Sequence, residues 1–268
     1  MASAQSARRW TLASHVRTCE CDGNVILLDL RSSRYLGIGG PASLMLASHV
    51  DNWPSCTAPA CAPLGLSAAE DLIGKLSQQG LLADASAAPR TATSADAMAG
   101  DMTVATVDRL TDFSPAHSIQ EATSTIVLDT DPACAPTAAR RFMDALQFTH
   151  SVASASCGLR CRSLLAISRT LAVRRARVLG PRAESLEAMT PAVAAYERLR
   201  PFLFTARAQC LLDSLALLGF LARSGFAARW VVGVRTGPFA AHSWVQHGST
   251  VLNDQHEYVR QFRPIHVV

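Results

Sequence analysis

The fold of the C-terminal part of the chain is decided by the stretch Cys210-Leu-Leu-Asp-Ser-Leu-Ala-Leu-Leu-Gly-Phe-Leu-Ala-Arg-Ser-Gly225. Wound as a helix, this stretch has apolar residues around most of its circumference, which is typical of a buried helix. We therefore predict a buried helix over Leu211–Ala222, with Cys210 immediately before it. Gly225 is expected to end it, because glycine readily adopts the left-handed conformation that follows many helices.

Strands are predicted directly after this helix. Phe226–Val234 is rich in β-formers, and Ala240–Gln246 and Thr250–Asp254 alternate apolar and polar residues. The three residues His247-Gly248-Ser249 suit a hairpin connection between the last two strands. The order helix, strand, strand, strand predicts an α+β unit with an antiparallel sheet.

Three side chains in this unit, a thiol, an imidazole and a carboxylate, are the groups that an activated cysteine nucleophile needs. A thiol at a helix N-terminus, such as that of Cys210, is stabilised as thiolate by the helix dipole, and the free N–H groups there can bind an oxyanion. His242 lies on one strand of the predicted hairpin and Asp254 at the end of the other. A carboxylate beside the imidazole would orient it while its other nitrogen takes the thiol proton.

Spacing alone leaves other interpretations open. The chain has eight cysteines and eight histidines, so a coincidental trio is easily found. His242 could be a half-buried strand histidine without a catalytic role. Asp213 could be a first-turn carboxylate that only complements the helix dipole.

The N-terminal part has a different pattern. His15–Cys21, Asn24–Leu30 and Arg34–Ile38 are predicted strands, with turns at Asp22-Gly23-Asn24 and at Arg31-Ser32-Ser33. One helical pattern begins at Pro41. A second helical pattern has Leu72, Ile73 and Leu76 on one face and ends at Gly80. Strands followed by helices indicate a small winged-helix-like module over residues 1–84.

The middle of the chain separates these two parts. From Ala83 to Thr103 the composition is Ala, Ser, Thr, Pro, Gly and Asp without aromatics, which indicates a linker. We assign residues 85–135 to this linker and to a segment whose candidate strand is Ser124–Leu128. Residues 136–268 form the second predicted domain, and it begins with mostly helical sequence over Thr137–Val178 and a short helix over Pro191–Arg200.

Composition excludes several classes of protein. The chain of 268 residues is 49% hydrophobic and 17% charged, enough to bury a core, and its net charge of +4 includes no long run of like charges. We expect no nucleic-acid partner and no membrane span. Without a secretory signal, a cytoplasmic location and cysteine thiols are expected. The pairs Cys19/Cys21 and Cys157/Cys161 lack the spacing of zinc ligands, so no metal site is predicted.

The local motifs resemble a known family. Cys210-Leu-Leu-Asp-Ser-Leu-Ala-Leu-Leu-Gly219, Trp230-Val-Val-Gly-Val-Arg235, Pro238-Phe-Ala-Ala-His-Ser-Trp-Val245 and Val251-Leu-Asn-Asp254 are similar to the lasso-peptide maturation proteases. These are transglutaminase-like (papain-like) cysteine proteases that remove the leader from a lasso precursor. By this resemblance Cys210 is the nucleophile, His242 the base and Asp254 the orienting acid.

The resemblance extends to the first 84 residues. Leu28-Asp-Leu-Arg-Ser-Ser-Arg-Tyr-Leu-Gly37 is similar to the precursor-recognition element of peptide-modifying pathways. Such elements bind the leader as an added strand, which fits β-augmentation and implies contacts from the strand that comprises Arg34, Tyr35, Leu36, Gly37 and Ile38.

The resemblance also implies the partners. They are the leader of a lasso precursor and an ATP-dependent macrolactam synthetase, an asparagine-synthetase-like cyclase. The protease itself is expected to need no cofactor, and ATP would act only through the cyclase. Two alternatives remain at the level of sequence: an acyl transferase of transglutaminase type, and a non-catalytic scaffold that presents the precursor.

Overall fold

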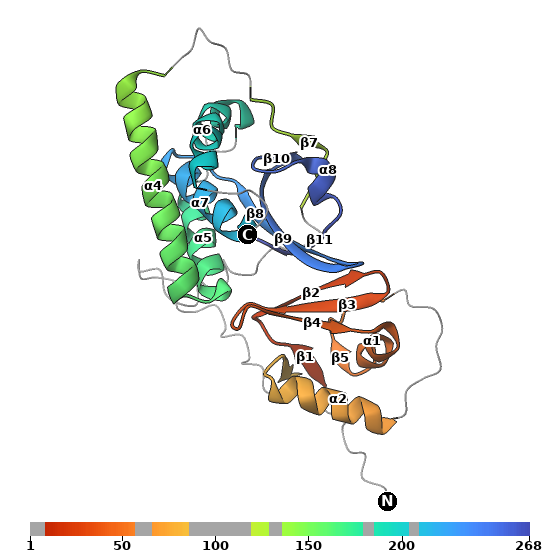
Figure 1. Ribbon diagram of the computed structural model, residues 1–268. Helices are drawn as coiled ribbons and strands as arrows, with labels where there is room; N and C mark the ends of the chain where they lie inside the picture. The colour runs from red at the N-terminus through yellow and green to blue at the C-terminus, as the bar shows by residue number, and fades with distance from the viewer. Residues whose placement is uncertain (1–8, 57–65, 86–118, 129–135, 179–184, 204–208) are drawn as a thin grey trace, which may run out of the picture. The chain divides into compact units, whose positions relative to one another are not determined.

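The computed structural model describes residues 9–56, 66–85, 119–128, 136–178, 185–203 and 209–268. These residues belong to two compact units, the first within residues 1–103 and the second within residues 104–268. Both units combine helices and strands, so the chain has a mixed α+β fold (Figure 1).

The first unit contains the three strands predicted from the sequence. They are β2 (Val16–Cys21), β3 (Asn24–Asp29) and β4 (Arg34–Ile38), antiparallel in the order β2-β3-β4. Asp22 and Gly23 both have positive φ, 50° and 75°, as a tight hairpin turn between twisted strands requires. The order places β4 at an edge of this sheet.

A second small sheet and two helices complete the described part of this unit. The sheet has the order β5-β1-β6, from β5 (Val50–Asp51), β1 (Trp10–Leu12) and β6 (Leu82–Asp84). The helices are α1 (Gly40–Ala47) and α2 (Leu66–Gln78). The sequence did not predict this sheet. Ala83 and Asp84, at the start of the stretch with linker composition, pair with β1.

One apolar core holds the first unit together. Buried side chains of the β2-β3-β4 sheet, of α1 and of α2 meet in it, among them Leu27, Leu46 and Leu76. Leu36 of β4 is partly buried against this core. The winged-helix-like class expected from the sequence stays a prediction.

The second unit is built on a five-stranded sheet of order β11-β8-β9-β10-β7. Its strands are β8 (Arg229–Thr236), β9 (Phe239–His247), β10 (Thr250–Val251), β11 (Arg263–Val267) and β7 (Ser124–Thr125). β8 and β9 form a continuous antiparallel ladder from Arg229 opposite Gln246 to Thr236 opposite Phe239. This ladder is the framework of the unit.

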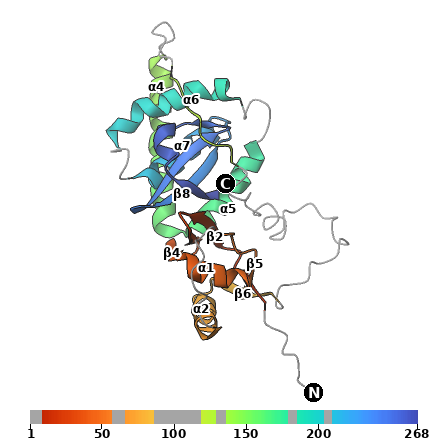
Figure 2. The same cartoon turned by 90° about the vertical axis from the view of Figure 1, so that its right-hand side faces the viewer.

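Helices cover this sheet. They are α4 (Ala138–Cys161), α5 (Leu164–Val178), α6 (Leu186–Leu199), the 3-10 turn η4 (Arg200–Phe202), α7 (Cys210–Arg223) and α8 (His256–Val259). α7 packs against β8, β9, α4 and α6 (Figures 1 and 2). It is buried from Asp213 to Leu221, as predicted. Gly225, with φ of 82°, ends it as expected.

Side chains alternate between the two faces of β8. Trp230 borders a hollow with Leu218 of α7, whereas Val231 packs with Val259 and Phe262 near the chain end. This alternation is the usual result of the strand pleat. The sheet is therefore buried on both faces, by α7 on one and by the α8 segment on the other.

The segment Ile119–Leu128, for which the sequence offered only a candidate strand, belongs to this sheet. β7 pairs in parallel with β10, Ser124 opposite Thr250. The side-chain amide of Gln246 also donates to the carbonyl oxygen of Gln120 at 2.7 Å. The strand is shorter than predicted, two residues, and its partner is far away in sequence.

Two element boundaries differ from the prediction in ways that affect the chemistry. Cys210 is the first residue of α7 and Gln209 is its N-cap, so the helix starts one residue earlier than expected. β10 ends at Val251, so Asp254 lies in a bend beyond the strand and not on it. α6 also starts earlier, because the Ser185 side chain caps it by accepting the N–H of Ala188.

Candidate active site

Cys210 opens α7, and its thiol is half-buried beside the sheet. Burial opposes ionisation of this thiol. A hydrogen bond with His242, attraction to its charge, and the backbone N–H groups of Ser243 and Leu211 outweigh burial and lower the pKa of Cys210 below its usual value. A thiolate is the reactive form of cysteine, so the position favours a nucleophile.

His242 lies on β9 directly opposite Gly233 of β8 and is buried. Its Nε2 lies 2.7 Å from Oδ2 of Asp254, which leaves Nδ1 for the thiol of Cys210. Burial acts to lower the pKa of the imidazole, but the hydrogen bonds to Asp254 and Cys210 raise it to about 9. The arrangement therefore favours a thiolate–imidazolium pair at neutral pH.

Asp254 completes the line of three side chains. Its Oδ1 accepts the backbone N–H of Gln255 at 2.7 Å, and its Oδ2 faces His242. Burial acts to raise the pKa of this carboxyl, but the hydrogen bonds from His242 and Gln255 lower it overall. The structure thus brings Cys210, His242 and Asp254 together, each within contact of the next.

An aromatic shell surrounds the imidazole of His242. The Trp244 ring stacks against it with centroids 6.1 Å apart, and the rings of Tyr258 and Phe262 lie 5.1 and 5.2 Å away. Such rings restrict the orientation of the imidazole and keep its neighbourhood apolar. The sequence analysis assigned no role to these residues, because they reach the histidine from β9, α8 and the loop before β11.

Gly233 is the position that makes room for this shell. A Cβ at Gly233 would lie 2.8 Å from Trp244 Cζ3 and 2.9 Å from Phe262 Cβ. Both distances are well below ordinary carbon–carbon contacts of about 3.5–4.0 Å. The glycine within the Trp230–Arg235 motif is therefore required by close packing.

Asp213 has more partners than the sequence indicated. It is 1% exposed, and its carboxylate accepts hydrogen bonds from Tyr196 Oη at 2.9 Å and Asn253 Nδ2 at 3.0 Å and pairs with Arg200 at 2.8 Å. Burial raises the pKa of Asp213, and the Arg200 charge and these hydrogen bonds oppose that effect. Complementing the helix dipole is thus only part of its role.

The five residues expected to bind the leader form one strand, β4, of the first unit. Ile38 is buried, Tyr35 and Leu36 are partly exposed, and Arg34 and Gly37 are exposed. Position at a sheet edge is the geometry that an added strand needs. Cys210, His242 and Asp254 lie in the second unit.

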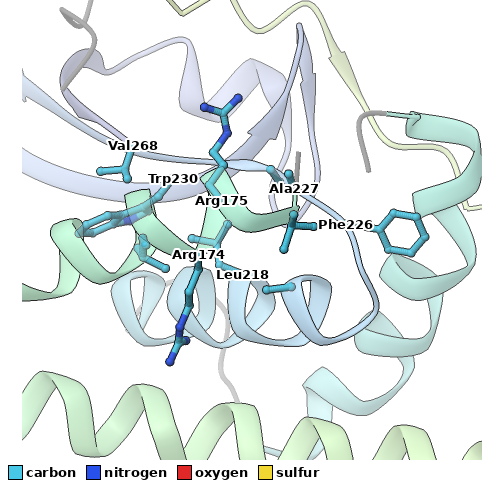
Figure 3. Close-up of a pocket in the computed structure, with 11 residues that line it drawn as sticks. Arg174, Arg175, Leu218, Phe226, Ala227, Trp230 and Val268 are labelled. Atoms are coloured by element: carbon cyan, nitrogen blue, oxygen red, sulfur yellow. The ribbon is translucent and has the colours of Figure 1, made fainter. Parts of the chain in front are cut away.

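Two hollows of the second unit lie apart from Cys210, His242 and Asp254. One, between α5, α7 and the start of β8, measures about 30 Å³ and is lined by residues including Leu218, Phe226 and Trp230 (Figure 3). This volume holds little more than a water molecule, so the hollow is too small to be a peptide site. The other, of about 290 Å³, is polar and borders Arg175, Arg229 and His247.

Neither a metal site nor a membrane helix is found among the described residues. No cluster of three or more metal-ligating side chains occurs in that part of the chain. Its described helices also lack the combination of length and apolarity needed to cross a bilayer. Cys56, Cys157, Cys161 and Cys210 are thiols there.

A comparison with family models accounts for this arrangement of helix and sheet. Residues 151–267 match the model described as the transglutaminase-like superfamily. They form a transglutaminase-like domain. The match runs from the second half of α4 to the end of β11 and includes all three side chains of the site.

A comparison with curated proteins found a more specific likeness. The chain is 46% identical over 48 residues to the microcin J25-processing protein McjB of Escherichia coli. This segment is 18% of the chain and spans only 23% of the relative. The two matches confirm the resemblance to lasso-peptide maturation proteases that the sequence motifs predicted. No solved structure matches the chain significantly.

Proposed function

We propose that this protein is a cysteine endopeptidase that binds a lasso-peptide precursor by its leader and cleaves the leader from the core peptide. The observation that carries the proposal is the line of Cys210, His242 and Asp254 within a transglutaminase-like domain. The processing role named for the similar McjB protein supports the substrate class.

The chemistry follows from the ionisation of the pair. The Cys210 thiolate attacks the carbonyl carbon of the scissile peptide bond, and N–H groups at the start of α7 are placed to stabilise the oxyanion. The His242 imidazolium, held by Asp254, gives its proton to the leaving amine as the C–N bond breaks. A thioester and the free amine of the core peptide result.

Water completes the reaction. His242, now neutral, takes a proton from a water molecule that attacks the thioester carbonyl. The leader leaves as a carboxylic acid, and Cys210 is returned. The sum is one peptide plus one water giving two shorter peptides, whereas an acyl transferase would resolve the same thioester with an amine.

The first unit is proposed to capture the leader. An extended peptide would add to the edge strand β4, where the backbone supplies hydrogen bonds and partly exposed Leu36 offers an apolar contact. Holding the leader in one unit raises the local concentration of the scissile bond at the other, to millimolar order for a short flexible connection. A net charge of +4 would also favour an acidic peptide.

The proposed partner downstream is an ATP-dependent macrolactam synthetase of asparagine-synthetase type. Cleavage frees the amine that such a cyclase would join to a side-chain carboxyl. The protease step itself needs no cofactor in this scheme, and ATP is used by the cyclase.

Mass spectrometry of a reaction with a lasso precursor peptide tests the proposal. Two peptides whose masses sum to that of the precursor plus one water are expected, and Cys210→Ala should give none. A crosslinked product would assign the acyl-transferase chemistry instead. An intact precursor that is still bound by the wild-type protein would assign the scaffold role.

Leader capture needs its own measurement. Fluorescence anisotropy of a labelled synthetic leader, titrated with full-length Cys210→Ala protein, reports binding without cleavage. Leu36→Asp should weaken binding, whereas Leu44→Asp, at an exposed site on α1, serves as the matched control. Equal binding by both variants would remove β4 from the proposal.

A further inference from the structure

The bend that carries Asp254 is held by side chains rather than by a strand. β10 ends at Val251, and only Leu252 continues the ladder, with its N–H donating to the Val245 carbonyl oxygen at 2.9 Å. Asp254 follows two residues later. A carboxylate in such a segment needs another support if it is to stay 2.7 Å from His242.

Asn253 supplies the contact that the ladder lacks. Its Oδ1 accepts the backbone N–H of Val245 at 2.8 Å. In a regular antiparallel pair this N–H would bond to a backbone carbonyl of the partner strand. The Asn253 side chain thus replaces the missing ladder bond and lets the chain turn away from β9 at this point.

The other end of the Asn253 amide reaches α7. Its Nδ2 donates to Asp213 Oδ2 at 3.0 Å and lies 3.3 Å from Ser214 Oγ. Asp213 is three residues after Cys210, on the first turn of the same helix. One amide therefore joins the strand that carries His242, the helix that carries Cys210 and the bend that carries Asp254.

Asp213 is itself fixed in place. Its carboxylate is almost fully buried and is compensated by the Arg200 guanidinium at 2.8 Å and the Tyr196 hydroxyl at 2.9 Å. Arg200 also bonds to Glu197 at 3.2 Å, on the last turn of α6. A buried carboxylate with charged and polar partners on two elements is a rigid anchor, because losing any partner leaves a polar group unpaired.

We infer that Asn253 is a positioning residue, which holds the Asp254 carboxylate against His242 through its hydrogen bonds to Asp213 and the Val245 backbone. This inference rests on the proposed triad. It does not depend on the identity of the substrate. Asn253 itself touches none of the reacting atoms, so its effect must pass through Asp254.

That requirement makes the inference testable by a double-mutant cycle. If Asn253 acts through Asp254, Asn253→Ala should lower activity in the wild-type background. The same substitution should cause no further loss in the Asp254→Ala background. A residue that only supports the core would cost the same in both backgrounds. The two roles are thus separated by the double variant.

The readout is alkylation of Cys210 by iodoacetamide in the full-length protein, measured against pH. Trypsin releases residues 208–223, which contain Cys210 as their one cysteine, so mass spectrometry follows this thiol alone. The rate at mildly acid pH reports the thiolate that the imidazolium stabilises. We expect it to fall about tenfold in Asn253→Ala, as in Asp254→Ala, with no further fall in the double variant.

Cleavage of the precursor supplies a second readout. Asn253→Ala should lower kcat by about 10²-fold with KM unchanged, since a displacement of about 1 Å at a catalytic group has this effect. Ser168→Ala is the control, because it also removes a buried hydrogen-bonding side chain of the second unit, bonded to His266 and far from Cys210 in the chain. It should leave the alkylation profile unchanged.

Three results would overturn the inference. They are an unchanged alkylation profile in Asn253→Ala, an additional loss in the Asp254→Ala background, and an equal loss in Ser168→Ala. If Asn253→Ala does not fold, Asn253→Asp replaces it, since aspartate keeps the acceptor for Val245 but loses the donor to Asp213. Failure of the proteolytic function would appear as an uncut precursor with a normal alkylation profile, so the two failures are distinguishable.

Discussion

Gly233→Ala is expected to damage both the stability and the chemistry of the second unit. Gly233 lies opposite His242 in the β8–β9 ladder, beneath the rings of Trp244 and Phe262. Those rings are in turn part of the shell around the imidazole. One added methyl group therefore acts on His242, the proposed catalytic base, through two neighbours.

The size of the effect follows from the distances. The new Cβ would lie 2.8 Å from the Trp244 ring and 2.9 Å from Phe262 Cβ, so each neighbour must move by about 0.6–1.2 Å to restore ordinary contact. Overpacking of this kind costs about 1–3 kcal/mol, and replacing glycine in a strand returns about 0.5–1 kcal/mol. The net loss of up to about 2.5 kcal/mol should lower Tm by up to about 10 °C.

The assay pairs thermal unfolding with precursor cleavage. A shift of the rings by this distance should also move His242 and lower kcat by about 10²-fold. Gly158→Ala is the control, because its Cβ would meet nothing within 4 Å and α4 should gain stability from alanine. A Gly233→Ala protein with the Tm and kcat of the wild type would refute the packing role assigned to this glycine.

Further predictions concern the ionisation of the site and the leader strand. Cys210→Ala should abolish cleavage but not binding of a labelled leader, and residual cleavage at the wild-type rate would contradict a nucleophilic role. The cleavage rate should form a bell against pH, because the reaction needs Cys210 deprotonated and His242 protonated. Its alkaline limb should lie near pH 9, where His242 loses its proton, and its acid limb below the usual pKa of cysteine. Asp254→Asn should keep the fold by circular dichroism, lower kcat and move the alkaline limb to lower pH, since an amide does not stabilise the imidazolium; an unmoved limb would contradict this pairing. Removal of residues 1–84 should raise KM for the precursor far more than it lowers kcat, as progress curves at limiting and saturating precursor would show.

The elements of the second unit were largely predictable from local patterns. The apolar run from Leu211 predicts a buried helix wherever it lies in a fold, and the alternation in Ala240–Gln246 predicts a strand. Hairpin residues such as Gly248 specify their turn by backbone conformation alone. The types and order of Cys210, His242 and Asp254 were likewise visible, although their proximity was not.

Contacts between segments that are distant in the sequence could not be predicted from such local patterns. β7 is two residues long and finds its partner 126 residues later, so no local period marks it. β1 and β6 have three residues each and β5 has two, and they pair only because the rest of the first unit brings them together. Strands of this length carry too few alternating residues for a period to be read.

The helical character of the longest segments, the β9–β10 hairpin and the identities of the proposed catalytic residues could be predicted from the sequence, because these depend on periodicity, turn chemistry and side-chain type. Only the tertiary structure decided that Asp254 leaves the strand and is held beside His242, that Asp213 is a buried anchor with three partners, and that Gly233 must lack a side chain. The physical reason is that each of these depends on groups brought together by packing. A buried carboxylate or a close ring contact is determined by its neighbours in space, which a linear pattern does not contain.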